Sequence, residues 1–275
     1  MTSKSSILVR RSSFVLLLLL AISPTMTQHV SPDACLYLPP WFASRVVFYD
    51  GFDLGDRNPE INRAGAQVLG DDPIVSDGFA GKGCRSTNPA ANEHPLNIRT
   101  PALSAARPLT VMRNWRLDAP MTATTSFQLI ALLGKGHISC FVHGAGEWCA
   151  LTRPTMFVQI DSFPRIANVN QPVRDNSYFQ PGQWHNISLT IANASDVRFY
   201  LDGQPLVSVS AQGRYFDADD IQSFQPCGDT GRDAEIATTT DDLIIVDRVL
   251  SPAEIAQYWQ SATALKQMSY PPIAR

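Results

Sequence analysis

Residues 183–209 show the clearest alternation of apolar and polar positions in the chain. Residues 186–191 alternate polar with apolar side chains, and residues 197–201 repeat the pattern starting from an apolar residue. A period of two predicts strands that have one apolar face. Asp202 and Gly203 then supply a tight hairpin turn, after which Val207 and Val209 resume the apolar face. Three strands of this kind need a second sheet or a helix to cover them.

Short runs of the same type recur along the chain and are bounded by Gly, Pro, Asn or Asp. Residues 127–133 are apolar on both faces, which predicts a buried central strand. Residues 168–182 are expected to form a polar loop, and residues 78–83 a tight turn that leads into a strand. The pattern predicts an all-β fold of two antiparallel sheets. Besides the three strands above, the expected strands are 46–53, 66–69, 74–75, 84–87, 109–117, 127–133, 138–142, 156–160, 221–224 and 241–247.

One helix is predicted after the last strand. Ser251, Pro252 and Glu254 form a capping box with proline at the first helical position. Ile255, Tyr258 and Trp259 fall on one face of this short helix, which is expected to pack on the sandwich. Residues 263–275 should be a loose tail. The predicted organisation is a leader over 1–27, an irregular lead-in over 28–45 and one domain over 46–262.

The leader has the order of a secretory signal peptide. Basic residues precede an unbroken apolar run over 14–22, and small and polar residues follow it. Nine residues are too few to span a bilayer, which needs about 20. No other apolar run is long enough for stable membrane insertion. The expected location is therefore extracellular or periplasmic, with an uncleaved N-terminal anchor as the alternative.

The charge balance argues against nucleic acid as a partner. Without the leader's Lys4, Arg10 and Arg11, the 22 basic residues fall to 19, against 25 acidic ones. Binding to nucleic acid or to an anionic membrane surface needs a basic footprint.

Five cysteines are present, and an exported chain can form disulfides. Cys140 and Cys149 lie nine positions apart around a glycine-containing segment, so a bridge between them is one expectation. Buried free thiols are the alternative. No spacing of Cys and His predicts a zinc site.

Several segments together resemble the laminin G-like, concanavalin A-like jelly-roll domain of secreted proteins. They are residues 46–53, 77–83, 183–203 and 241–255, and the resemblance covers roughly residues 46–260. It implies two antiparallel sheets stacked face to face, with a short C-terminal helix. Members of this superfamily mostly bind glycans or proteins, and some are hydrolases or lyases, so the fold by itself assigns no function. The last strand departs from the usual pattern: it is apolar on both faces at Ile244 and Val246, so either the helix or a partner must cover it.

The resemblance also implies a structural calcium that ties the first strand to the last. Asp50, Gly51 and Asp241 occupy the matching positions. The alternative is that Asp241 and Asp242 cap the last strand through hydrogen bonds to the backbone.

Catalytic motifs are not visible in the sequence. None of the five glutamates is followed two positions later by Asp, as the paired carboxylates of laminarinase-like hydrolases require, and there is no Gly-x-Ser-x-Gly elbow. Trp115 and Trp184 lie on predicted strands and are expected in the core, which leaves Trp148 as the candidate for stacking on a sugar. Of two glycosylation patterns, Asn186 lies within a strand and Asn193 in a turn, so Asn193 is the expected acceptor.

These observations predict a secreted, non-catalytic, lectin-like module whose ligand is a glycan or a cell-surface protein. One alternative is a carbohydrate-active enzyme whose site uses Asp217, Asp219 or Glu147. Another is a structural protein that assembles through the apolar last strand.

Overall fold

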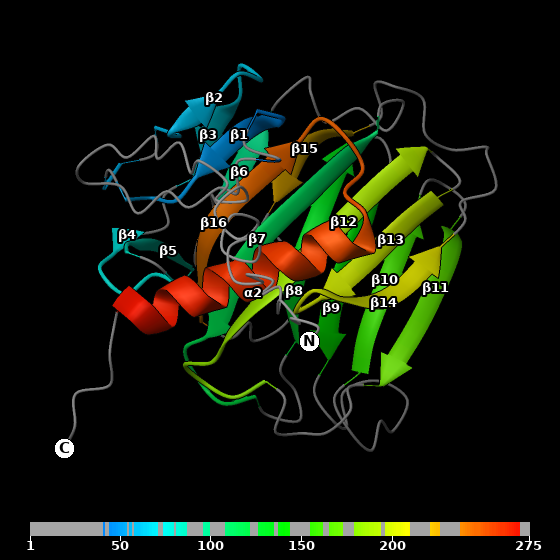
Figure 1. Cartoon of the computed structure of the whole chain (residues 1–275). Helices are drawn as coiled ribbons and strands as arrows, with labels where there is room; N and C mark the ends of the chain where they lie inside the picture. The colour runs from blue at the N-terminus through cyan, green and yellow to red at the C-terminus, as the bar shows by residue number, and fades with distance from the viewer. Residues whose placement is uncertain are drawn as a thin grey trace, which may run out of the picture.

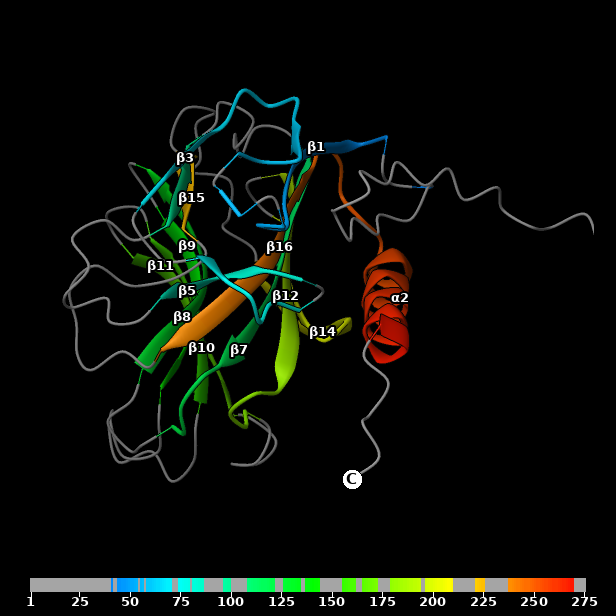
Figure 2. The same cartoon turned by 90° about the vertical axis from the view of Figure 1, so that its left-hand side faces the viewer.

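A computed structural model gives the fold. It describes residues 41, 44–53, 55–56, 58–70, 74–79, 81–86, 96–99, 108–121, 126–134, 137–143, 155–161, 165–172, 179–193, 196–209, 221–225 and 237–269. Within these residues the chain forms two antiparallel sheets that face each other, with a helix outside one of them (Figures 1 and 2). The predicted two-sheet all-β fold is confirmed.

The first sheet has nine strands. Seven follow the order β14-β13-β12-β7-β16-β1-β2, while β5 pairs with β16 and β4 pairs with β5. The hairpin units expected around residues 183–209 are present as three consecutive neighbours at one edge. The strands are β1 (Val46–Asp50), β2 (Ile61–Asn62), β4 (Ile74–Val75), β5 (Gly83–Ser86), β7 (Leu109–Leu117), β12 (Trp184–Asn193), β13 (Asp196–Leu201), β14 (Gln204–Val209) and β16 (Thr238–Val246).

The second sheet has seven strands in the order β11-β10-β9-β8-β15-β6-β3. The strand β8, which the sequence predicts to be central, lies in the middle of this order. The strands are β3 (Gln67–Leu69), β6 (Asn97–Arg99), β8 (Ser126–Gly134), β9 (His137–His143), β10 (Thr155–Asp161), β11 (Arg165–Pro172) and β15 (Ile221–Gln225).

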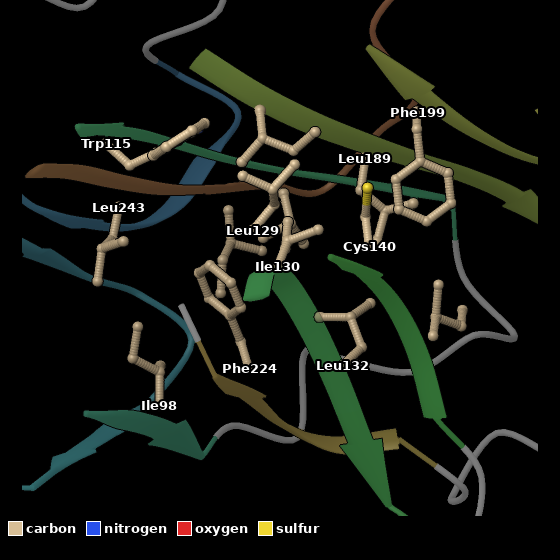
Figure 3. Close-up of a cluster of buried hydrophobic side chains, with 14 of the residues drawn as sticks. Ile98, Trp115, Leu129, Ile130, Leu132, Cys140, Leu189, Phe199, Phe224 and Leu243 are labelled. Atoms are coloured by element: carbon tan, nitrogen blue, oxygen red, sulfur yellow. The ribbon is translucent and has the colours of Figure 1, made fainter. Parts of the chain in front are cut away.

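The main core lies between the sheets. Figure 3 shows Trp115, Leu189 and Phe199 of the first sheet turned toward Ile130 and other apolar residues of the second. The period of two puts each inward row on one face of its strand, and burying such a side chain contributes roughly 1.5–3 kcal/mol.

A second apolar layer lies on the outer face of the first sheet, beneath α2 (Pro252–Ser269) (Figure 2). Ile255 and Tyr258 of the helix pack against Met112, Ile244 and Val246. The helix therefore covers the apolar outer row of β16. The expectation that this strand forms an assembly interface is wrong, because its outer side chains are already buried within the chain.

The structure differs from the sequence-based expectation at three further points. The segment expected to be a polar loop from residue 168 begins inside β11, an edge strand whose polar composition hides it. The strands β2 and β6 have only two and three residues, too few to show a period. Helix α2 continues to Ser269, because good helix formers follow Ala262 in what was expected to be a loose tail. In the described part of the chain, no helix has the length and apolar character needed to cross a membrane.

Candidate functional site

A corner with a left-handed residue follows β1. The backbone turns at Phe52, which has a φ of 57°, and the Phe52 amide donates to Asp50 Oδ1 over 3.0 Å. The Gly51 amide donates to Glu60 Oε2 over 2.9 Å. A Cβ on Gly51 would lie 2.6 Å from the Tyr49 hydroxyl oxygen, so a larger residue there would displace the buried Tyr49 side chain. Two carboxylates thus hold one turn through its backbone.

Each of these carboxylates has a second oxygen that is buried and makes no hydrogen bond: Asp50 Oδ2 and Glu60 Oε1. Asp50 is fully buried, and burial raises its pKa to about 7, with a further rise from Glu60 and an opposing effect from the Phe52 amide. Burial also raises the pKa of Glu60. Removing a carboxylate from water without full compensation is costly, so the buried oxygen without a hydrogen bond disfavours the charged form of each side chain.

The sequence misses Glu60. Phe48 pairs with Asn62 and Tyr49 with Ile61. The same register carried one step further places Asp50 opposite Glu60. Glu60 can be recognised as a neighbour of Asp50 only once the pairing of β2 with β1 is known. A strand of two residues is too short to be predicted from periodicity.

Asp241, the third expected calcium ligand, is engaged by the backbone. Its Oδ2 accepts from the Phe79 amide over 2.6 Å, and its Oδ1 accepts from the Asp242 amide over 2.7 Å. These are the backbone hydrogen bonds that the alternative reading of Asp241 described. Within the described residues no group of three or more His, Cys, Asp or Glu side chains is arranged to hold a metal ion. A cation bound at Asp50 and Gly51 would therefore need backbone oxygens and water beside the two carboxylates.

A polar layer lies between α2 and the sheet. Asp242 Oδ1 accepts from the Tyr49 hydroxyl over 2.6 Å, and its Oδ2 accepts from Asn114 Nδ2 over 2.8 Å. Asn186 Nδ2 in turn donates to Asn114 Oδ1 over 2.9 Å. Burial raises the pKa of Asp242 to about 6, against the effect of its two donors. Since Tyr258 of the helix contacts Asn114, this layer is a helix-docking surface rather than an open site.

The glycine-containing turn at residues 78–81 is held as a structural element. Its Phe79 ring lies 5.5 Å from the ring of Trp184 and 5.7 Å from that of Trp259. Arg116 stacks over Trp184 at 5.2 Å, and its Nη2 lies 2.7 Å from Asp77 Oδ2. The turn leads into β5, which is the role that the sequence predicted for it.

Of the tryptophan and carboxylate residues considered for ligand binding or catalysis, the structure describes some and not others. Trp115 and Trp184 are 0% and 9% exposed, which confirms both as core residues. The proposed sugar-stacking residue and the carboxylates of the enzyme alternative lie outside the described residues: Trp148, Glu147, Asp217 and Asp219.

The structure gives no support to the expected Cys140–Cys149 bridge. Cys140 is a free thiol in the inward row of β9, and burial raises its pKa while the charge of Arg113 opposes the rise. Cys149 lies outside the described residues. Asn186 is fully buried, as expected of a strand residue, whereas Asn193 at the end of β12 is exposed.

Part of the chain matches a known protein family. Residues 128–256 match the family model described as the concanavalin A-like lectin/glucanases superfamily. No curated protein matches the chain at the level of sequence.

Solved structures share the fold at low identity. The binding domain of Paraclostridial Mosquitocidal Protein 1 superposes with a TM-score of 0.59 at 15% identity, over 79% of this chain and 52% of that one. The binding domain of botulinum neurotoxin D/C in complex with rat synaptotagmin II gives 0.57 at 10% identity, over 80% and 52%. The chain thus spans about half the length of these toxin domains.

A third structure is matched over nearly its whole length. Domain 4 of AbnA, an extracellular GH43 arabinanase from Geobacillus stearothermophilus, in complex with arabinotriose, gives a TM-score of 0.54 at 16% identity. The match covers 78% of this chain and 97% of that domain.

Proposed function

Because residues 128–256 match the model of the concanavalin A-like lectin/glucanases superfamily, we propose that the chain is a secreted, non-catalytic carbohydrate-binding module. Its proposed ligand is an oligosaccharide held by loops at one rim of the sandwich. The family match and the two-sheet fold support a binding module, and the saccharide, the export and the lack of catalysis are the proposed parts.

The observation that favours a saccharide is the extent of the arabinanase match. Domain 4 of that enzyme is matched over 97% of its length and was solved with arabinotriose, whereas the toxin domains are matched over about half. A complete domain is a closer functional comparison than part of a larger one. The identity of 16% supports the fold, so arabinotriose is the first probe rather than an assigned ligand.

The placement of α2 restricts where a ligand can bind. The helix buries the outer face of the first sheet around Met112, Ile244 and Val246, so that face is closed to a saccharide. The proposed site is therefore at a rim, because loops carry recognition in many two-sheet folds. Trp148 is the proposed stacking residue, because a tryptophan ring supplies apolar area that suits a sugar face.

Calorimetric titration of the full chain with arabinotriose and a panel of plant and bacterial oligosaccharides tests the proposal. We expect saturable binding of at least one saccharide, and at least a ~10-fold loss of affinity in Trp148→Ala. Leu69→Ala removes an exposed apolar side chain and serves as the control, with no change expected. Absence of binding to the whole panel would overturn the saccharide proposal. Unchanged affinity in Trp148→Ala would remove that residue from the site.

A protein ligand is the second candidate, and one observation favours it. The fold neighbour from botulinum neurotoxin D/C was solved with synaptotagmin II, which is a protein partner. If the saccharide panel fails, capture of a defined cell-surface protein at a measured affinity would support this second candidate.

A further inference from the structure

We infer that the outer face of the second sheet, across β8, β9, β10 and β11, binds an extended, uncharged polysaccharide. The inference rests on the proposed function in one respect, which is that the ligand is a saccharide. It adds a surface separate from the rim site, because its residues lie on strands rather than in loops.

The strand register shows which residues form this outer face. Ile138, Cys140 and Val142 of β9 belong to the core between the sheets. Successive residues of a strand lie on opposite faces, so the odd-numbered residues of β9 lie on the outer face. Directly paired residues of an antiparallel ladder share a face, so the pairing of β9 extends this face to β8 and β10, and that of β10 extends it to β11.

Two phenylalanines occupy opposed positions in the middle of this face. Phe141 pairs with Phe157, and the row continues to Asn170 on β11 and to Gln128 on β8. Opposed residues of an antiparallel pair lie about 4.5–5.5 Å apart at Cβ, so the two phenylalanines are close neighbours. Aromatic rings match the apolar face of a sugar, and amides both donate to and accept from its hydroxyl groups. This row therefore has the composition that a saccharide requires.

The next row along the strands is also polar and uncharged. Ser139 pairs with Gln159 and with Ala131, and Gln159 pairs with Asn168. Neighbouring strands lie ~4.8 Å apart, which is close to the length of one sugar unit in an extended glycan. A polysaccharide that crosses the strands would thus place about one sugar over each strand.

The lack of charge favours a neutral ligand. A third row has His143 paired with Ser126 and Thr155, and Thr155 paired with Pro172. Among the described residues of these three rows there is no Asp, Glu, Lys or Arg. An anionic polysaccharide needs basic partners. The core of a protein interface is mostly apolar, whereas most of these positions carry an amide or a hydroxyl group.

The two sheets differ in what lies over their outer faces. Helix α2 packs on the outer face of the first sheet, and Figure 2 shows it on the side of the molecule away from β8–β11. A pair of phenylalanines at outer positions, away from this apolar cover, suits a ligand that supplies the cover instead.

Native electrophoresis of the full chain, in gels that contain a polysaccharide, tests the inference. The neutral probes are linear arabinan, xylan and mixed-linkage β-glucan, and the charged probe is polygalacturonate. We expect at least one neutral probe to slow the chain and polygalacturonate to have no effect. Phe141→Ala and Phe157→Ala should each weaken the affinity at least ~10-fold, while Phe157→Tyr should keep most of it because the ring remains.

Two further variants keep the test decisive. Gln159→Ala removes an amide rather than a ring and should weaken binding at least ~3-fold, which matters if alanine at a phenylalanine position unfolds the chain. Leu69→Ala is the matched control. Leu69 is exposed on the same outer face, but it lies on β3 at the opposite edge of the sheet, so no change is expected.

The outcomes separate this surface from the rim site. Arabinotriose binding that depends on Trp148, with no retardation by any neutral polysaccharide, would overturn this inference alone. Retardation that persists unchanged in Phe141→Ala, Phe157→Ala and Gln159→Ala would also overturn it. So would a wild-type dimer in light scattering that Phe141→Ala converts to a monomer, because a second copy of the chain would then cover this face.

Discussion

His185 Nδ1 lies 2.8 Å from Asp202 Oδ2, and this contact joins the start of β12 to the turn between β13 and β14. The other oxygen of Asp202 accepts from the Asn186 amide over 2.8 Å. Asp202 itself has a φ of 51°, in the left-handed region. One side chain therefore fixes the turn between β13 and β14 to the neighbouring strand β12.

Replacing Asp202 should be costly. Asp202→Ala removes both hydrogen bonds and places a residue that disfavours positive φ in the turn, so we expect a loss of about 3 kcal/mol in the free energy of unfolding. Asp202→Asn keeps an acceptor and tolerates the left-handed conformation, so its loss should be near 1 kcal/mol. Urea denaturation measures both. Equal stability of Asp202→Ala and the wild type would show that the contact is not structural.

Because Asn114 lies in the polar layer under α2, we expect its replacement to lower the free energy of unfolding strongly. Asn114→Leu withdraws a donor from the Asp242 carboxylate and an acceptor from Asn186, and unsatisfied buried polar groups cost roughly 1–3 kcal/mol each. We therefore expect a loss of about 3 kcal/mol in urea denaturation. Met112→Leu, on the same face of β7, conserves volume and should cost less than about 1.5 kcal/mol. A similar loss in both variants would contradict the role assigned to this layer.

The packing of the Phe79 ring is expected to attach its turn to the rest of the protein and so to stabilise the fold. The side chain is 2% exposed between Trp184 and Trp259, so Phe79→Ala should lower the free energy of unfolding by about 3–5 kcal/mol. Phe79→Leu should recover part of this loss, because it fills much of the same volume. If the alanine and leucine variants are both as stable as the wild type, the ring does not anchor the turn.

Protonation of Glu254 is expected to lower the stability of the folded protein at acid pH. Its pKa is lowered from 4.5 to about 2, chiefly by hydrogen bonds from Arg248, with help from the amide and hydroxyl of Ser251. The folded state therefore binds this proton more weakly than the unfolded state does. The stabilisation is complete above the unfolded pKa and is lost as pH falls from about 4.5 toward 2.

Melting temperatures measured over that pH range check this effect. Glu254→Gln should have a lower melting temperature than the wild type at neutral pH and a smaller decline below pH 4.5. Asp196→Asn removes an exposed ion pair with Arg198 and should change little, since such pairs contribute weakly. A wild type and a Glu254→Gln variant with parallel pH profiles would contradict the assignment.

Strand content follows from the sequence wherever the period of two is long enough. The strands β7 and β12 have nine and ten residues, and their alternation, turn residues and order identify them. Helix α2 is marked by its capping box, in which Ser251 Oγ accepts from the Glu254 amide and the Glu254 carboxylate accepts from the Ser251 amide. The polar edge strand β11 carries too few apolar residues to be recognised.

The candidate cation site shows where prediction from sequence stops. Asp50 and Gly51 are found through the family resemblance, which also points to Asp241. Glu60 depends on the pairing of a two-residue strand, and that pairing is set by tertiary structure rather than by any local pattern. One hydrogen bond of Asp241 likewise joins it to Phe79, 162 residues away along the chain, a relationship that no spacing rule shows.

A glycan array probed with the full chain, with each bound glycan recovered and weighed by mass spectrometry, tests the proposed function most directly. The account predicts that at least one glycan is retained in a saturable manner and is recovered at its original mass. Recovery of a glycan in shortened or otherwise altered form would contradict the non-catalytic role. Failure of the chain to bind any glycan on the array would contradict the carbohydrate-binding role.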